Sequence, residues 1–177
     1  MPKKPPIHEL EFLKQSNNHL EFARRLQSLG IPTAALRLYA EFVCTAWFQL
    51  GQSHLAEAKN IAATQSDRAV YSRAYYAAYN ASKATRYMVS GFVSLKGDDH
   101  GKASTDLPGD FPNVVKWAGI LSTLYEHRLR ADYDNWTDTA AQLTLTPVQV
   151  IEHAEEFIEE ARNYLNGTAG TATLSSN

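Results

Sequence analysis

The chain has 177 residues and a net charge of −2, with 44% apolar and 20% charged residues. This length fits one domain, or one domain with an extension, and is sufficient for a core that needs no disulfide or metal. The slightly acidic balance argues against a broad nucleic-acid-binding surface, which requires an excess of Lys and Arg, but it allows a local basic groove.

Cys44 is the single cysteine, so neither a disulfide framework nor a cysteine-based metal site fits within one chain. It falls in an apolar helical pattern and is predicted to be a small buried hydrophobe. The N-terminus lacks the apolar core of a signal peptide, and no stretch approaches about 18 uninterrupted apolar residues, so we expect a cytoplasmic protein without a membrane segment. The six histidines include no i,i+4 pair, and we expect neither a metal nor a cofactor.

The N-terminal part of the chain is predicted to be helical after a short lead. Residues 1–6 are basic and rich in proline, and they are predicted to be disordered. A helical period begins at Ile7. Gly30 and Pro32 end it, because glycine is a common helix C-cap and proline blocks continuation.

A second apolar period follows. Thr33 is a candidate cap, and Gly51 weakens or breaks the pattern. Residues 33–64 therefore fit either one long helix or two. We expect residues 7–52 to form an added N-terminal helical hairpin and residues 53–166 to form the main bundle.

The next predicted helix, residues 68–89, is built around SRAYYAAYNASKATRYM. At 100° per residue its small side chains fall on one narrow face, where another helix can approach closely. This seam is expected to receive the helix that carries Arg128. Another side combines polar and aromatic residues and is either a binding face or a solvated one: Arg73, Tyr76, Asn80, Lys83 and Tyr87.

Residues 90–111 contain four glycines, a proline and four aspartates without periodicity, and they predict a long surface loop with at most a short turn of helix. Loops this long inside a compact domain are usually functional or disordered.

Residues 112–132 predict another helix, which begins with Pro112. Its apolar stripe includes Leu121 and Tyr125 and continues into Arg128 and Asp132, at the core or at a cleft at its end, whereas His127 is expected to project away from that stripe.

After a connection at residues 133–145, Thr146 and Gln149 form a capping-box pattern with a proline at the first helical position. The last helix then runs to a small, polar tail, residues 167–177, which is predicted to be disordered. No strand-like alternation is present. The fold is predicted to be all-α: an up-and-down bundle of four or five helices with the added N-terminal hairpin.

Arg128, Asp132 and Tyr133 form the most specific polar pattern. One interpretation is an i,i+4 ion pair that closes the end of the bundle, with Tyr133 packed over it. The other is that Arg128 offers its fork of donors to a phosphate while a neighbouring hydroxyl or carboxylate holds the attacking group. The residues alone leave both interpretations open.

The segments SRAYYAAYNASKA, DHGKA and LYEHRLRADYD, followed by a helix ending in FIEEARNYL, resemble the HEPN domain. The similarity is greatest to stand-alone prokaryotic HEPN proteins with an R-x-x-A-D-Y signature, and it covers residues 53–165. It implies an up-and-down bundle that forms a homodimer. It also implies association with RNA or nucleotides in toxin–antitoxin or phage-defence modules, in some of which a nucleotidyltransferase antitoxin is the partner.

Active HEPN ribonucleases are metal-independent and pair an Arg with a His a few residues later. Here Arg128 is present, but Ala131, Asp132 and Tyr133 stand where that His is expected. Asp132 is expected to orient Arg128. Tyr133 is a poor base because tyrosine titrates near 10. In related toxins a tyrosine near this motif receives AMP from the partner, and Tyr133 matches that position although Glu126 stands where the Arg should be.

Five further residues are predicted to shape a cleft around Arg128: Arg73, Tyr76, Asn80, His100 and Lys102. Three hypotheses follow. The first is a dimeric RNA- or nucleotide-associated protein without strong catalysis, which the missing His favours. The second is a metal-independent endoribonuclease using Arg128 with Asp132 or Tyr133. The third is a purely structural helical interaction module.

Overall fold

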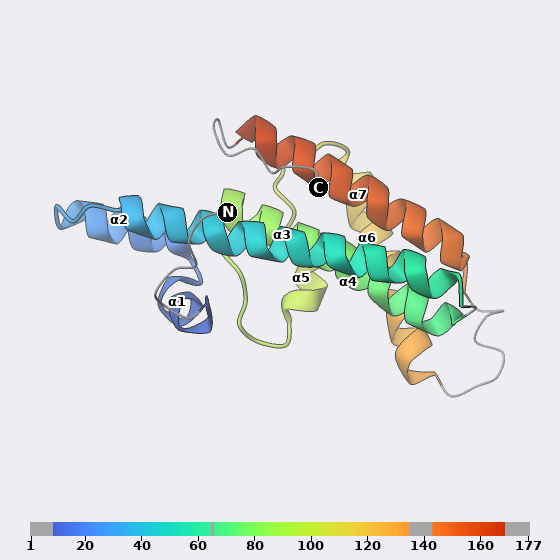
Figure 1. Ribbon diagram of the computed structural model, residues 1–177. Helices are drawn as coiled ribbons and strands as arrows, with labels where there is room; N and C mark the ends of the chain where they lie inside the picture. The colour runs from blue at the N-terminus through green and yellow to red at the C-terminus, as the bar shows by residue number, and fades with distance from the viewer. Residues whose placement is uncertain (1–8, 65, 135–142, 169–177) are drawn as a thin grey trace.

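A computed structural model describes residues 9–64, 66–134 and 143–168. Within these ranges the chain forms seven α-helices, and the only β-type pairing is an isolated antiparallel bridge between Asn18 and Phe92. α3 and α4 lie side by side, α7 crosses them, and α6 packs on α4 (Figure 1). The predicted all-α bundle is therefore confirmed. In chain order the helices are α1 (Glu9–Ser16), α2 (His19–Ser28), α3 (Ala34–Ala62), α4 (Asp67–Ser90), α5 (Asp99–Thr105), α6 (Val114–Tyr133) and α7 (Pro147–Thr168).

The single helix predicted between Ile7 and Gly30 is wrong, because α1 and α2 are separate helices. Asn18 causes the break. Its side chain accepts a hydrogen bond from the backbone N–H of Glu21 at 3.1 Å and so caps α2. The backbone on either side of it bonds to the segment after α4, where His19 N–H donates to the carbonyl of Gly91 at 2.9 Å.

α3 is one continuous helix of 29 residues, which resolves the question of one helix or two. It runs without interruption through the boundary that was expected between residues 52 and 53. Gly51 does not break it. A Cβ at this position would lie 2.8 Å from the backbone oxygen of Ala77, so the glycine lets α3 approach α4 closely.

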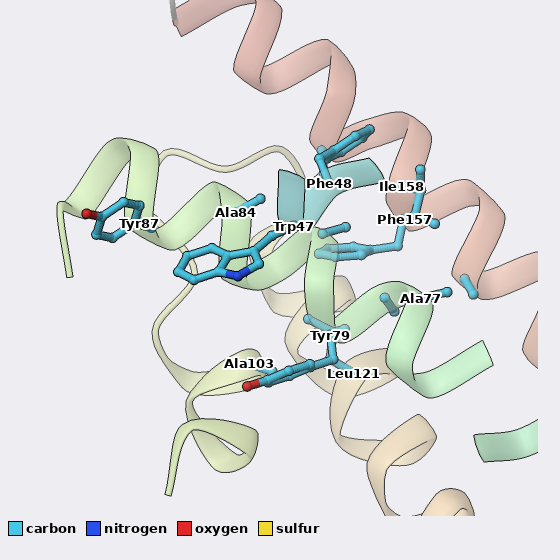
Figure 2. Packing of buried hydrophobic residues seen from close by; sticks show 14 of the residues in the cluster. Trp47, Phe48, Ala77, Tyr79, Ala84, Tyr87, Ala103, Leu121, Phe157 and Ile158 are labelled. Carbon is cyan, nitrogen blue, oxygen red and sulfur yellow. The ribbon is translucent and has the colours of Figure 1, made fainter. Parts of the chain in front are cut away.

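α4 is the central helix and packs against α3, α6 and α7, with more than half of its residues buried. Gly51 of α3 meets the small-residue seam at Ala77 and Ala81. The expectation that the Arg128 helix packs on this part of the seam is therefore wrong. Figure 2 shows Trp47 of α3 beside Tyr87 of α4, with ring centroids 5.4 Å apart.

Cys44 is buried, as predicted, and its thiol donates to the carbonyl of Ala84 at 3.1 Å. Burial raises the pKa of this thiol to about 12, so it stays protonated and unreactive at neutral pH.

The glycine-rich segment at residues 90–111 is only partly a surface loop. It contains α5, and Asp99 at the start of α5 is 3% exposed. Both carboxylate oxygens of Asp99 accept hydrogen bonds from the buried guanidinium of Arg86, at 3.1 and 3.0 Å. Tyr79 donates to the same carboxylate at 2.8 Å. A buried ion pair therefore fastens this segment to α4.

The predicted core stripe of α6 is rotated from the observed one. The buried residues are Trp117, Leu121, Leu124, His127 and Ala131. The prediction that His127 projects away is wrong, because Nε2 of its ring accepts a hydrogen bond from the backbone N–H of Leu145 at 3.1 Å. The chain before α7 therefore returns over α6 and covers His127.

The capping box at the start of α7 is confirmed. Thr146 Oγ1 accepts from the N–H of Gln149 at 3.3 Å, and Gln149 Oε1 accepts from the N–H of Thr146 at 2.9 Å. α7 continues to Thr168, so the predicted disordered tail is wrong for residues 167–168. Residues 1–6 and the rest of that tail lie outside the described residues.

Across the part of the chain that the structure describes, no helix combines the length and apolarity needed to cross a membrane. The same residues contain no group of three or more histidine, cysteine, aspartate or glutamate side chains arranged to hold a metal ion.

Candidate functional site

Arg128 lies near the end of α6 between two tyrosine rings. Its guanidinium carbon is 5.5 Å from the ring centroid of Tyr76 and 5.3 Å from that of Tyr133, and Nη2 donates to the Tyr76 hydroxyl at 3.0 Å. Nε lies 2.8 Å from Asp132 Oδ2, but its N–H does not point at that oxygen, so the contact is an ion pair without a hydrogen bond. A hydrogen bond to the Tyr133 side chain adds to these contacts and helps to raise the pKa of Arg128.

An aromatic cluster lies beside this arginine, which it contacts through Tyr76, and consists of Tyr75, Tyr76, Tyr79, His100 and Tyr125. The ring of His100, on α5, stacks on Tyr79 with centroids 4.5 Å apart and on Tyr125 at 6.1 Å. It lies edge-on to Tyr76 at 6.0 Å. His100 Nδ1 and the Tyr75 hydroxyl oxygen are 2.8 Å apart. Three helices thus bring together a fixed cation, a histidine and four tyrosine rings.

Burial and neighbouring charged side chains set the protonation states of His100, Arg128 and Tyr75. Burial and then the positive charge of Arg128 lower the pKa of His100, so the imidazole is neutral at pH 7. Partial burial alone would lower the pKa of Arg128, but Tyr76 and Asp132 outweigh this effect and raise it. Burial raises the pKa of Tyr75, which therefore keeps its proton. The site presents one permanent cation, paired with one carboxylate, beside a neutral imidazole.

This arrangement predicts the titration of His100. Because its folded-state pKa lies below the ordinary 6.5, protonation favours the unfolded chain, and this histidine contributes stability that is lost as pH falls below about 6.5. In an NMR titration Arg128→Gln should raise the pKa of His100 by removing the nearby cation. Lys102→Gln should leave it unchanged. Equal shifts in the two variants would contradict the proximity of Arg128 and His100.

Three of the predicted residues contact Arg128, namely Tyr76, Asp132 and Tyr133, and a fourth, His100, lies beside Tyr76. Arg73 is engaged elsewhere. Its Nη1 donates to His54 Nδ1 at 3.2 Å, and its Nε lies 3.3 Å from a carboxylate oxygen of Glu57. The His54 ring is 5.7 Å from that of Tyr76, so Arg73 borders the aromatic cluster without facing Arg128.

Lys102 and Asn80 do not contact Arg128. Lys102 lies 3.6 Å from Asp98 and over the ring of Phe92, 4.9 Å from its centroid. Asn80 is buried, and its side chain donates to the carbonyl of Tyr76 one turn earlier in α4 at 2.8 Å. It therefore supports the helix next to Tyr76 without facing the site.

Three tyrosines of the aromatic cluster were not predicted as site residues: Tyr75, Tyr79 and Tyr125. A signal for them exists in the sequence, because Tyr75 and Tyr79 are one helical turn apart and Tyr125 is close to Arg128 on a second helix. What the sequence does not give is that α5 places His100 between the two helices.

Comparisons of the chain with protein-family models, with curated proteins and with solved structures found no match.

Proposed function

We propose that the protein is a HEPN-like, dimeric RNA- or nucleotide-binding protein that works as an accessory or toxin-like component of a toxin–antitoxin or phage-defence module. The observation that carries this proposal is the guanidinium of Arg128, held between Tyr76 and Tyr133 beside the aromatic cluster. A planar guanidinium suits a phosphate, and tyrosine and histidine rings stack on unpaired bases.

Asp132 limits what one copy of the site can do. A phosphate must compete with this carboxylate, which lies 2.8 Å from Arg128. A homodimer that faces two copies of Arg128 toward one phosphodiester would give the phosphate two guanidinium groups to contact at once, although each copy brings its own Asp132. Weak binding by a monomer and tighter binding by a dimer are therefore expected.

The test is binding of a fluorescent single-stranded RNA, measured by anisotropy at fixed salt. Arg128→Gln should weaken binding about tenfold or more, because it removes a charge-assisted contact. Arg130→Gln is the matched control, since Arg130 is exposed on the same helix two residues away. Equal losses in both variants would indicate only diffuse charge attraction. No binding of RNA or nucleotide by the folded wild type would favour the structural interaction module instead.

A metal-independent endoribonuclease is the second candidate, favoured by the position of His100. A neutral imidazole in the same cluster as Arg128 can take up a proton, a role that Tyr133 fills poorly. RNA cleavage in EDTA that is abolished separately by Arg128→Gln and by His100→Ala would establish this function. Cleavage that survives both changes would show that another group or a contaminant is responsible.

A further inference from the structure

The N-terminal arm, formed by α2 and the first turns of α3, extends beyond the end of α4 (Figure 1). Along the seam between its two helices lies a half-open cavity of about 390 Å³, which we call the arm groove. This volume is at the lower end of the range for small-molecule sites. The groove follows α2 from His19 to Gln27, which is about 12 Å at 1.5 Å per residue. None of its lining residues belongs to the site around Arg128.

The groove has apolar surface along its length. Leu20 and Ala23 of α2, Ala40 of α3 and Met88 near the end of α4 line it, and Ala23 and Ala40 are buried. An aliphatic body is therefore the complement of the groove.

His19 supplies a directional polar contact at one end. It is 5% exposed, and its Nε2–H donates to the carbonyl of Tyr87 at 2.8 Å. A carbonyl only accepts, so Nε2 holds the proton. Burial lowers the pKa of His19, and the ring is neutral. Nδ1 is then a hydrogen-bond acceptor, and it has no partner among the described residues.

Charge along the groove favours an anion with a single charge. Arg37 is exposed, lines the groove and has no partner among the described residues. Arg24 also lines it but is already paired with Glu21 at 3.0 Å. Glu41 adds a negative charge to the same lining, which disfavours a dianion such as a phosphate monoester. Arg37 is thus the free cation that a carboxylate would meet.

We infer that the arm groove binds a small, elongated monoanion. Its carboxylate contacts Arg37, its aliphatic body lies on Leu20, Ala23, Ala40 and Met88, and a hydrogen-bond donor at its other end reaches Nδ1 of His19.

The test uses three probes of equal chain length, measured by calorimetry on the full chain: octanoate, its ω-hydroxy derivative and octylamine. Octanoate should bind. The hydroxy derivative should bind about fivefold more tightly because it donates to His19, and octylamine about tenfold more weakly because it meets Arg37. No binding of octanoate, equal binding of octylamine, or no gain from the hydroxyl would overturn the inference.

Matched variants locate the site. Arg37→Gln should weaken octanoate binding about tenfold, whereas Arg25→Gln should leave it unchanged. Arg25 is also an exposed arginine of the arm, but it pairs with Glu21 and does not line the groove. Both positions are exposed, so folding is preserved. Equal losses in the two variants would overturn the placement of the carboxylate at Arg37.

Discussion

Asp99→Ala should destabilise the protein by about 3–5 kcal/mol, since it leaves the charge of Arg86 buried without a partner. Arg86 is 1% exposed, and Asp99 accepts hydrogen bonds from it, from Tyr79 and from the backbone N–H of Ser94. Burial alone would raise the pKa of Asp99, but Arg86 outweighs it and lowers the pKa, so the pair is ionised at neutral pH. Thermal unfolding should shift downward by roughly 2–4 °C for each kcal/mol.

Asp98→Ala is the matched control, because the two aspartates are adjacent and Asp98 is exposed. Asp98→Ala should lower the free energy of unfolding far less than Asp99→Ala does. Asp99→Asn keeps the shape and loses the charge, and it should fall between the two. If Asp98→Ala and Asp99→Ala destabilise the chain equally, the ion pair is not the contact that fastens α5 to α4. Asp99→Ala should also disturb the site around Arg128, because His100 follows Asp99 directly in α5 and should lose its fixed position in the aromatic cluster.

Gly51→Ala should destabilise the fold, although alanine is the better helix former. The added Cβ would lie 2.8 Å from the backbone oxygen of Ala77 and 3.4 Å from the backbone nitrogen of Ala81. α3 and α4 must separate to admit it. We expect a net loss of about 1–3 kcal/mol, as for other overpacked cores, measured by urea denaturation.

Gly119→Ala should have the opposite effect on stability to Gly51→Ala. Gly119 lies inside α6, is exposed, and has nothing within 4 Å of the position of a Cβ. Alanine there should stabilise the chain by about 0.5–1 kcal/mol through helix propensity alone. Stabilisation of similar size by Gly51→Ala would contradict the close approach of α3 and α4.

Local patterns predicted local structure well. The capping box of Thr146 and Gln149 and the i,i+4 pair of Arg128 and Asp132 both depend on residues within one turn of a helix, and both are present. The long apolar periods predicted the helices because amphipathic spacing is set by burial along one face. Gly51 left the number of helices in residues 33–64 undecided, because an interior glycine can either break a helix or admit a closely packed neighbouring helix.

Contacts between distant parts of the chain were not predictable in the same way. Arg86 and Asp99 lie on different elements, and nothing near Asp99 marks it as buried. His127 is covered by Leu145, eighteen residues later. Tyr76 and Arg128 are 52 residues apart. Tyr76 was predicted to shape a cleft around Arg128, but its direct hydrogen bond to that guanidinium was not predicted.

The continuity of α3 gives the molecule a mechanical property. Its 29 residues make a rod of about 44 Å at 1.5 Å per residue. Ala40 of the arm groove lies toward one end, and His54, beside Tyr76, lies toward the other. The same helix therefore lines the arm groove near one end and contacts the aromatic cluster near the other. Cutting the chain between residues 52 and 53 would divide this rod and separate Trp47 and Phe48 from the rest of the core, so the arm and the bundle form one rigid unit.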